Sequence, residues 1–225
     1  MRRLTIPAVL LAIGCASTTP APAPARPASS SPSSANPGPP VEADEYTRYE
    51  LLAPETSQFH ILYEVTAVAP GATAYFNPIR KGSVASGERV TDRMTGEDLR
   101  FEVVSPEEAR RSGLADAEEG TDYIRVHLPR PVPSGGGQVR LLIEKTYKDP
   151  KSYFADPSGA GGEIVFTRSL GIPRNSVVLP AGYELVSCNV PSQVLTDASG
   201  RIFISFMNAG PAEAPLTIRA RKLPS

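Results

Sequence analysis

The chain has 225 residues, and its 23 basic and 24 acidic side chains leave a formal net charge of −1 at neutral pH. A nucleic-acid-binding protein normally carries a basic face, so this balance argues against a nucleic-acid partner. The two cysteines, Cys15 and Cys188, lie in segments of very different composition, so we consider each in its own context.

The first 14 residues have the parts of a secretory signal peptide. Arg2 and Arg3 precede an apolar run of eleven residues, from Leu4 to Gly14. As a helix this run would reach about 16 Å. Because the hydrocarbon core of a bilayer is about 30 Å thick, the run is too short to span it. A positive start, a short apolar core and small residues at its end are typical of a cleaved signal.

The residues from Ala12 to Cys15, AIGC, resemble the lipobox of bacterial lipoproteins. The resemblance implies that the Cys15 thiol receives a diacylglyceryl group and that Cys15 becomes the first residue after cleavage. Acyl chains on Cys15 would anchor the protein stably to a bilayer. Ala16, in place of an aspartate, implies sorting to the outer membrane, with the face of that membrane left open. The alternative is an ordinary signal peptide followed by an incidental cysteine.

Residues 15–42 are expected to form a disordered tether. After Cys15 the chain reads ASTTPAPAPARPASSSPSSANPGPPVE, without an aromatic residue. Such a segment cannot bury enough apolar surface to offset the conformational entropy that folding removes. We expect it to hold the folded part away from the lipid.

Residues 43–225 are long enough for one domain with a sizeable core. Alternation of apolar and polar residues predicts a strand from Phe59 to Ala67. Similar runs occupy 73–77, 99–104, 122–128, 138–147, 163–169, 176–180, 183–188, 201–208 and 216–222. A single short helix is indicated by Ser105 as a cap, Pro106 in the first turn and Gly113 as a terminator. The pattern predicts an all-β chain with a single β-sandwich domain and one short inserted helix.

The sequence contains no catalytic, metal or cofactor motif that we recognise, so no metal, cofactor or catalytic residue is predicted. The two histidines, His60 and His127, sit inside predicted strands, where a histidine is usually a surface or cross-strand residue. Cys188 also lies among strand residues, where a small buried thiol is the ordinary role. An envelope hydrolase that uses Cys188, or two carboxylates brought together by the fold, remains the alternative.

Two stretches are candidates for a binding surface. In EKTYKDPKSYF, lysines alternate with aromatic residues, which suits contact with a glycan, an anionic group or a protein. The ordinary reading is a strand end with lysines that extend to the solvent. The second stretch, residues 167–194, is punctuated by prolines and predicts two short strands joined at residues 180–182. The candidate binding residues are Lys145, Tyr147, Lys148, Lys151, Tyr153, Arg168, Arg174 and Asn175.

The stretches VTDRMTGEDLRFEVV and DYIRVHLPRPVPSGGGQVRLLIEKTY resemble the amino-terminal β-sandwich domain of gluzincin (M1-type) aminopeptidases. The resemblance covers about 60 residues and implies a sandwich fold and a non-catalytic module. In that family the zinc-binding catalytic domain follows the sandwich, so the resemblance transfers no active-site residue to this chain.

Together these features predict a lipid-anchored protein of the bacterial envelope that acts as a non-catalytic binding or accessory module, with a protein or an envelope glycan as its partner. In a third interpretation, the segment from Leu170 to Val194 docks onto a larger envelope complex. In that case Arg174→Glu would abolish co-purification of the partner without lowering the melting temperature.

Overall fold

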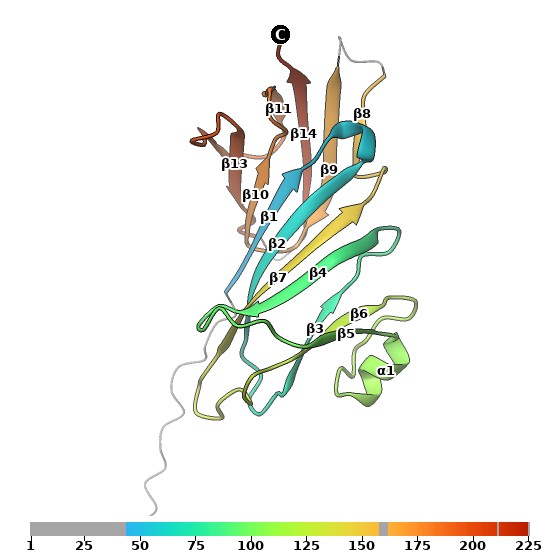
Figure 1. The fold of residues 1–225 in the computed structure, drawn as a ribbon, viewed down its shortest axis with the longest axis vertical. Coiled ribbons are helices and arrows are strands. Elements are labelled where there is room, and N and C mark those ends of the chain that lie inside the picture. The colour runs from blue at the N-terminus through green and yellow to red at the C-terminus, as the bar shows by residue number, and fades with distance from the viewer. Residues whose placement is uncertain (1–43, 158–161, 211, 225) are drawn as a thin grey trace, which may run out of the picture. The chain divides into compact units, whose positions relative to one another are not determined.

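The computed structural model describes residues 44–157, 162–210 and 212–224, which form three β-sheets and one short α-helix (Figure 1). The predicted signal peptide (1–14) and the Cys15 tether (15–42) lie outside the described residues. No helix in the described part of the chain has the length and apolar character that a membrane crossing requires.

The largest sheet has seven strands in the order β12-β13-β10-β1-β2-β7-β4. Its neighbours are antiparallel, except that β1 pairs with β10 in parallel. The strands are β1 (Glu45–Leu51), β2 (Gln58–Ala67), β4 (Val84–Asp92), β7 (Val139–Lys148), β10 (Arg174–Val178), β12 (Gln193–Thr196) and β13 (Ile202–Met207).

Two smaller sheets accompany it. In Figure 1 the four-stranded sheet, in the order β11-β14-β9-β8, lies toward the upper end, and the three-stranded sheet, β3-β6-β5, lies with α1 toward the lower end. Their elements are β3 (Ala74–Pro78), β5 (Phe101–Val104), α1 (Pro106–Arg111), β6 (Tyr123–His127), β8 (Tyr153–Ala155), β9 (Glu163–Leu170), β11 (Tyr183–Cys188) and β14 (Ala214–Lys222). A 3-10 turn, η1 (Pro54–Thr56), joins β1 to β2.

The core lies between the sheets and follows the predicted alternation. Phe59, Ile61 and Val65 of β2 are buried, as the sequence pattern predicted. They belong to one continuous cluster that also takes in residues of both smaller sheets, such as Phe166 and Ile124. The sheets therefore pack as a sandwich, which confirms the predicted fold class. The rings of Phe59 and Phe166 meet edge to face at 5.3 Å between centroids, across two of the sheets.

The predicted helix is present as α1. The Ser105 hydroxyl accepts a hydrogen bond from the Glu108 amide at 3.3 Å, as an N-cap residue does. Pro106 and Ala109 are the buried residues of the helix, and Ala109 belongs to a small cluster with Tyr123 of β6. The helix thus covers one part of the three-stranded sheet.

The proline-rich segment after Arg168 forms two strands, as predicted, but they belong to different sheets. β10 pairs with β1 and β13, whereas β11 pairs with β14. The turn between them has a positive φ of 76° at Gly182, a conformation that favours glycine. This turn therefore carries the chain from one layer of the sandwich to the other.

Candidate functional site

A cavity of about 700 Å³ opens beside the inner face of the seven-stranded sheet. Strands β1, β2 and β7 contribute its floor, which includes Tyr49, Ile61, Tyr63, Lys145 and Tyr147. The other walls come from residues 76–81, at the end of β3 and just after it, from residues 168–172, at the end of β9 and just after it, and from the loop between α1 and β6. We call this space the central cavity.

Lys145 lies inside because of the register of β7. The inward residues of this strand are Val139, Leu141, Ile143, Lys145 and Tyr147, so a lysine takes a position that the pattern assigns to an apolar side chain. Only 4% of Lys145 is exposed. Its Nζ donates a hydrogen bond to Asn77 Oδ1 and lies 5.0 Å from the centroid of the Tyr147 ring. No carboxylate in the described part of the chain forms an ion pair with Lys145.

The surroundings of Lys145 favour its neutral form. Burial, followed by the positive charge of Arg168, lowers the pKa of Lys145 to about 7, and the charge of Glu88 opposes this shift. Glu88 belongs to a bulge in β4, where the pairing with β7 shifts between Ser86 and Arg89. The bulge requires a positive φ of 64° at Gly87. Lys145 can therefore change its charge near neutral pH.

Arg168 reaches the same cavity from the other layer. On β9 it follows Ile164 and Phe166 on the inward face, and its side chain is 4% exposed. The guanidinium carbon lies 5.7 Å from the Tyr49 centroid, 5.2 Å from that of Phe59 and 5.7 Å from that of Tyr147. Burial lowers the pKa of Arg168, but an arginine starts so high that it stays charged. Its Nε atom is buried and has no hydrogen-bond partner among the residues that the structure describes.

Asp149 provides the carboxylate that balances Arg168. Its Oδ2 lies 3.3 Å from Arg168 Nη1 and accepts hydrogen bonds from the hydroxyls of Ser152 at 2.7 Å and Ser83 at 3.1 Å. Burial alone would raise the pKa of Asp149, but these hydrogen bonds and the charge of Arg168 together lower it. Asp149 thus balances the charge of Arg168, whereas Lys145 has no carboxylate partner among the described residues.

Exposed charged residues of both signs surround the mouth of the cavity. Arg80 donates to the Ser169 carbonyl at 3.1 Å, and Lys81 donates to the Glu119 carbonyl at 2.8 Å. The lining also includes three exposed carboxylates, Asp116, Glu118 and Glu213. The cavity is therefore cationic in its interior and, at its mouth, has more acidic than basic side chains.

Three of the eight residues predicted to bind, Lys145, Tyr147 and Arg168, line the central cavity. The predicted exposed aromatic surface is wrong: Tyr147 is 2% exposed, and Tyr153, at 0%, donates from its hydroxyl to the Leu52 carbonyl. Both side chains lie on the inward faces of their strands, and the lysine–aromatic pattern of this stretch did not indicate which face is buried.

The other predicted binding residues lie elsewhere. Lys148 and Lys151 are exposed at the end of β7 and in the following turn. Arg174 is half-exposed and pairs with Asp44 at 2.5 Å. Asn175 does not belong to an exposed binding surface, because it is 2% exposed and its Nδ2 donates to the Ile172 carbonyl at 2.6 Å.

Sequence reasoning missed Asn77 and Asp149, which hold the two cations. Neither residue belongs to a motif, and each contacts a residue that is distant in sequence. The position of Lys145 could have been predicted from the sequence, since it falls on the alternate positions of β7 that otherwise carry apolar or aromatic residues.

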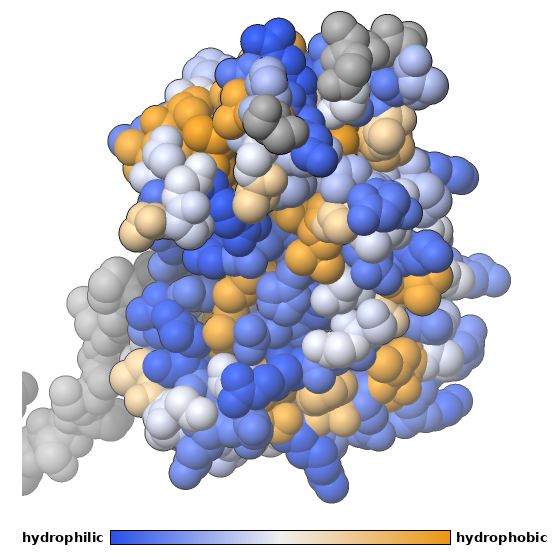
Figure 2. Space-filling view, turned by 45° about the horizontal axis from the view of Figure 1, so that its top comes forward, coloured by the Kyte–Doolittle hydropathy of each residue, from blue (hydrophilic) through white to orange (hydrophobic). Residues whose placement is uncertain are grey.

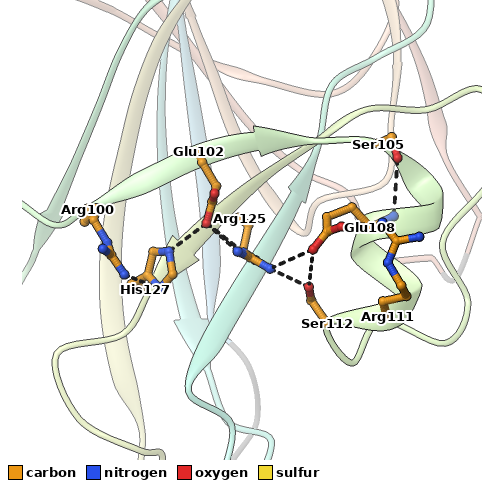
Figure 3. Close-up of polar contacts among 8 residues, drawn as sticks. All are labelled: Arg100, Glu102, Ser105, Glu108, Arg111, Ser112, Arg125 and His127. Carbon is orange, nitrogen blue, oxygen red and sulfur yellow. Dashed lines mark hydrogen bonds and ion pairs between the residues drawn. The ribbon is translucent and has the colours of Figure 1, made fainter.

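The histidines take part in surface contacts. His127 Nε2 lies 2.8 Å from Glu102 Oε1, and Arg125 Nη2 donates to the same oxygen at 2.5 Å (Figure 3). Arg125 also reaches Ser112, just after α1, and so joins the helix to the three-stranded sheet. His60 Nδ1 lies 3.3 Å from Thr146 Oγ1 on the neighbouring strand. Both histidines thus have cross-strand partners, as expected.

A second surface feature is an apolar sheet edge. Val194 and Leu195 of β12 are 46% and 51% exposed, and Met207 of β13 is 72% exposed. Figure 2 shows hydrophobic residues gathered at the upper left of the molecule, over the end that carries β11 and β13. Cys188, on β11, is half-buried and has a free thiol. Among the described residues, no group of three histidine, cysteine or acidic side chains is placed to hold a metal ion.

No protein-family model matches this chain, and no curated protein matches it. Among solved structures, an M1 zinc metallopeptidase from Deinococcus radiodurans matches with a TM-score of 0.46 and 13% identity. The match covers 80% of this chain and 42% of the metallopeptidase. A mutant of an M1 zinc metallopeptidase described as having two domains, bound to L-tryptophan, matches over the same shares with a TM-score of 0.45 and 13% identity.

These neighbours are of the same class as the family that the sequence resembles. The chain spans less than half of their length. Similarity at this level transfers neither activity nor residue roles.

Proposed function

We propose that this chain is a lipid-anchored, non-catalytic binding module of the bacterial envelope and that the central cavity is its ligand site. The observation that carries the proposal is the burial of Lys145 and Arg168 beside one open cavity, where, among the described residues, only Arg168 has a carboxylate partner. Burying charge is unfavourable unless it is paired, so such a group is a candidate functional site. A cavity of about 700 Å³ is within the size range of small-molecule sites.

The arrangement of the other reactive side chains favours binding over hydrolysis. A Cys188 hydrolase would need a base beside the thiol. His60 and His127 instead contact Thr146 and Glu102, on sheets other than that of β11.

The anchor is proposed from the lipobox alone, and it is tested in cells. The full chain and its Cys15→Ala variant are expressed in a bacterium that is fed an alkyne-labelled palmitate. We expect the label on the membrane-bound wild type, and an unlabelled variant that is released from the membrane fraction. An unlabelled wild type would contradict the anchor.

The binding site is tested by blocking its mouth. Gly171 lines the cavity, and a Cβ at this position would meet the Glu213 side chain at 3.6 Å, an ordinary contact distance. Gly171→Trp should therefore fold and obstruct the opening. Gly135→Trp is the matched control, because a Cβ there meets nothing within 4 Å and Gly135 lies outside the cavity lining.

The lipoprotein, purified in detergent, is incubated with a small-molecule extract of the envelope, and retained molecules are measured by native mass spectrometry. The wild type and Gly135→Trp should retain a molecule that Gly171→Trp does not. Retention by none of the three proteins, or equal retention by all three, would refute the cavity as the ligand site.

A further inference from the structure

We propose that the central cavity binds a small organic molecule with a single anionic group, a carboxylate or a phosphate monoester, which lies against Lys145 and Arg168. This inference rests on the proposed function, since it names the class of ligand that the same cavity would take.

The first step is the balance of charge inside the cavity. Arg168 has Asp149 as its ion-pair partner, whereas Lys145 has, within the described part of the chain, only the neutral amide oxygen of Asn77. When Lys145 is protonated, the buried group carries one positive charge more than it can neutralise. An anion that enters the cavity would pair with that charge in surroundings that water screens weakly.

The second step is the geometry of Arg168. Three aromatic rings surround the guanidinium, and their ring atoms do not accept ordinary hydrogen bonds from it. Its N–H groups can therefore still donate to a ligand. Nη1 already faces Asp149, but the buried Nε has no partner. An anion with two oxygens on one atom suits this arrangement, because two oxygens of a carboxylate or of a phosphate can bond to neighbouring guanidinium nitrogens.

The third step is the lining beyond the two cations. Ile61, Tyr63, Phe76 and Leu170 face the cavity and offer apolar surface to the body of a ligand. Pockets for small organic molecules typically combine such a lining with a few polar groups that fix the orientation. An inorganic anion alone would leave most of the space unfilled.

The fourth step limits the ligand to one anionic group. Three carboxylates at the mouth outnumber the two cations there. A polyanion that extended outward would place negative charge beside Asp116, Glu118 and Glu213. Repulsion at the mouth therefore discriminates against nucleoside triphosphates and charged polymers.

The test uses water-soluble probes of one shape and different charge. Phenylacetate, benzyl phosphate, neutral phenylacetamide and cationic benzylamine are titrated calorimetrically into the detergent-purified lipoprotein at pH 6.5. We expect at least one anion to bind ten times or more tightly than phenylacetamide, and benzylamine not to bind. The stronger of the two anions identifies the preferred group.

Variants then locate the binding. Lys145→Met should weaken the preferred anion by at least tenfold, while Lys222→Met, at the exposed end of β14, should leave its affinity unchanged. Lys145→Gln, which can still bond to Asn77, provides a second neutral variant if the first does not fold. Circular dichroism checks the fold of each variant.

Three results would overturn the ligand class: no binding of either anion, equal binding of phenylacetate and phenylacetamide, or full affinity in both Lys145 variants. If phenylacetamide binds to the wild type but not to Gly171→Trp, the cavity remains a ligand site and only the anionic class fails. The two proposals can therefore be refuted separately.

Discussion

The Asp149–Arg168 pair allows a quantitative test of the buried charges. Asp149→Asn keeps an oxygen that can accept from Ser152 but removes the charge opposite Arg168. Removing one partner of a buried ion pair costs about 3–5 kcal/mol, because the other charge is left uncompensated. Since Asn preserves part of the hydrogen bonding, we expect a loss near the lower end, about 3 kcal/mol. For a domain of this size, such a loss lowers the melting temperature by about 6–12 °C.

The effect should depend on pH in a defined direction. The folded-state pKa of Asp149 lies below the ordinary value of 3.8, so its charge stabilises the fold above that value. This contribution is lost as the pH falls through the lower folded-state pKa. The difference between wild type and Asp149→Asn should therefore stay constant from pH 7 to pH 5 and shrink only below about pH 4.

The assay is urea unfolding of the full chain followed by far-ultraviolet circular dichroism, since the sequence contains no tryptophan for fluorescence. Glu184→Gln is the control, because it breaks an exposed pair with Arg221 and should cost less than about 1 kcal/mol. Equal stabilities for the two variants at pH 7 would show that the Asp149–Arg168 pair is not a buried, coupled unit.

Three further perturbations test other parts of the structure. Lys145→Met should raise the free energy of unfolding at pH 6 by about 1–4 kcal/mol, because it removes an unfavourable buried charge. Because the folded-state pKa of Lys145 is lowered to about 7 from 10.5, the wild type should gain stability as the pH rises between these values. The stability advantage of Lys145→Met over the wild type should therefore shrink. A constant difference from pH 6 to pH 9 would contradict the lowered pKa. Phe59→Ala, at the centre of the aromatic core, should cost about 3–5 kcal/mol in urea unfolding, and a loss under 1 kcal/mol would be inconsistent with its burial. Ser105→Ala should cost about 1 kcal/mol by removing the cap of α1, whereas Ser105→Asp should retain most of the stability in the same assay.

The sequence predicted the inner strands well because apolar and polar side chains alternate along them, and this alternation identifies the buried face. β2, β7 and β9 have apolar residues at every second position over most of their length. The cap at Ser105 was equally local, since the helix needs only neighbouring residues to begin. Features of this kind depend on a few consecutive residues and one buried face.

Other strands were not predicted because their positions in the fold do not require a regular alternation of buried apolar residues. All four residues of β12 are exposed at the edge of the seven-stranded sheet, so no alternation marks it. The pattern of β4 is interrupted by the bulge at Gly87. The buried positions of β1 alternate, but Thr47 is polar, which leaves Tyr49 and Leu51 as the apolar residues that mark the buried face. Such strands are specified by their neighbours rather than by their own composition.

The candidate site lies between these extremes. The alternation of β7 and β9 is enough to place Lys145 and Arg168 on inward faces. The sequence does not show that the two side chains meet, because the strands belong to different sheets. Asn77 and Asp149 became part of the site only through contacts 68 and 19 residues away in the chain.

The stability and the binding of Lys145→Met, taken together, decide what the buried lysine is for. If Lys145 only supported the fold, its replacement would lower the free energy of unfolding of the protein. The affinity for a ligand would then change only because part of the protein is unfolded. A lysine held in place to receive an anion is expected to show the opposite sign: a more stable protein with weaker binding. Because Asn77, Tyr147 and Arg168 surround the amine and the cavity remains open beside it, we expect the second result. Measuring both quantities on one preparation at pH 6.5 separates the two roles, since no structural lysine would yield the combination.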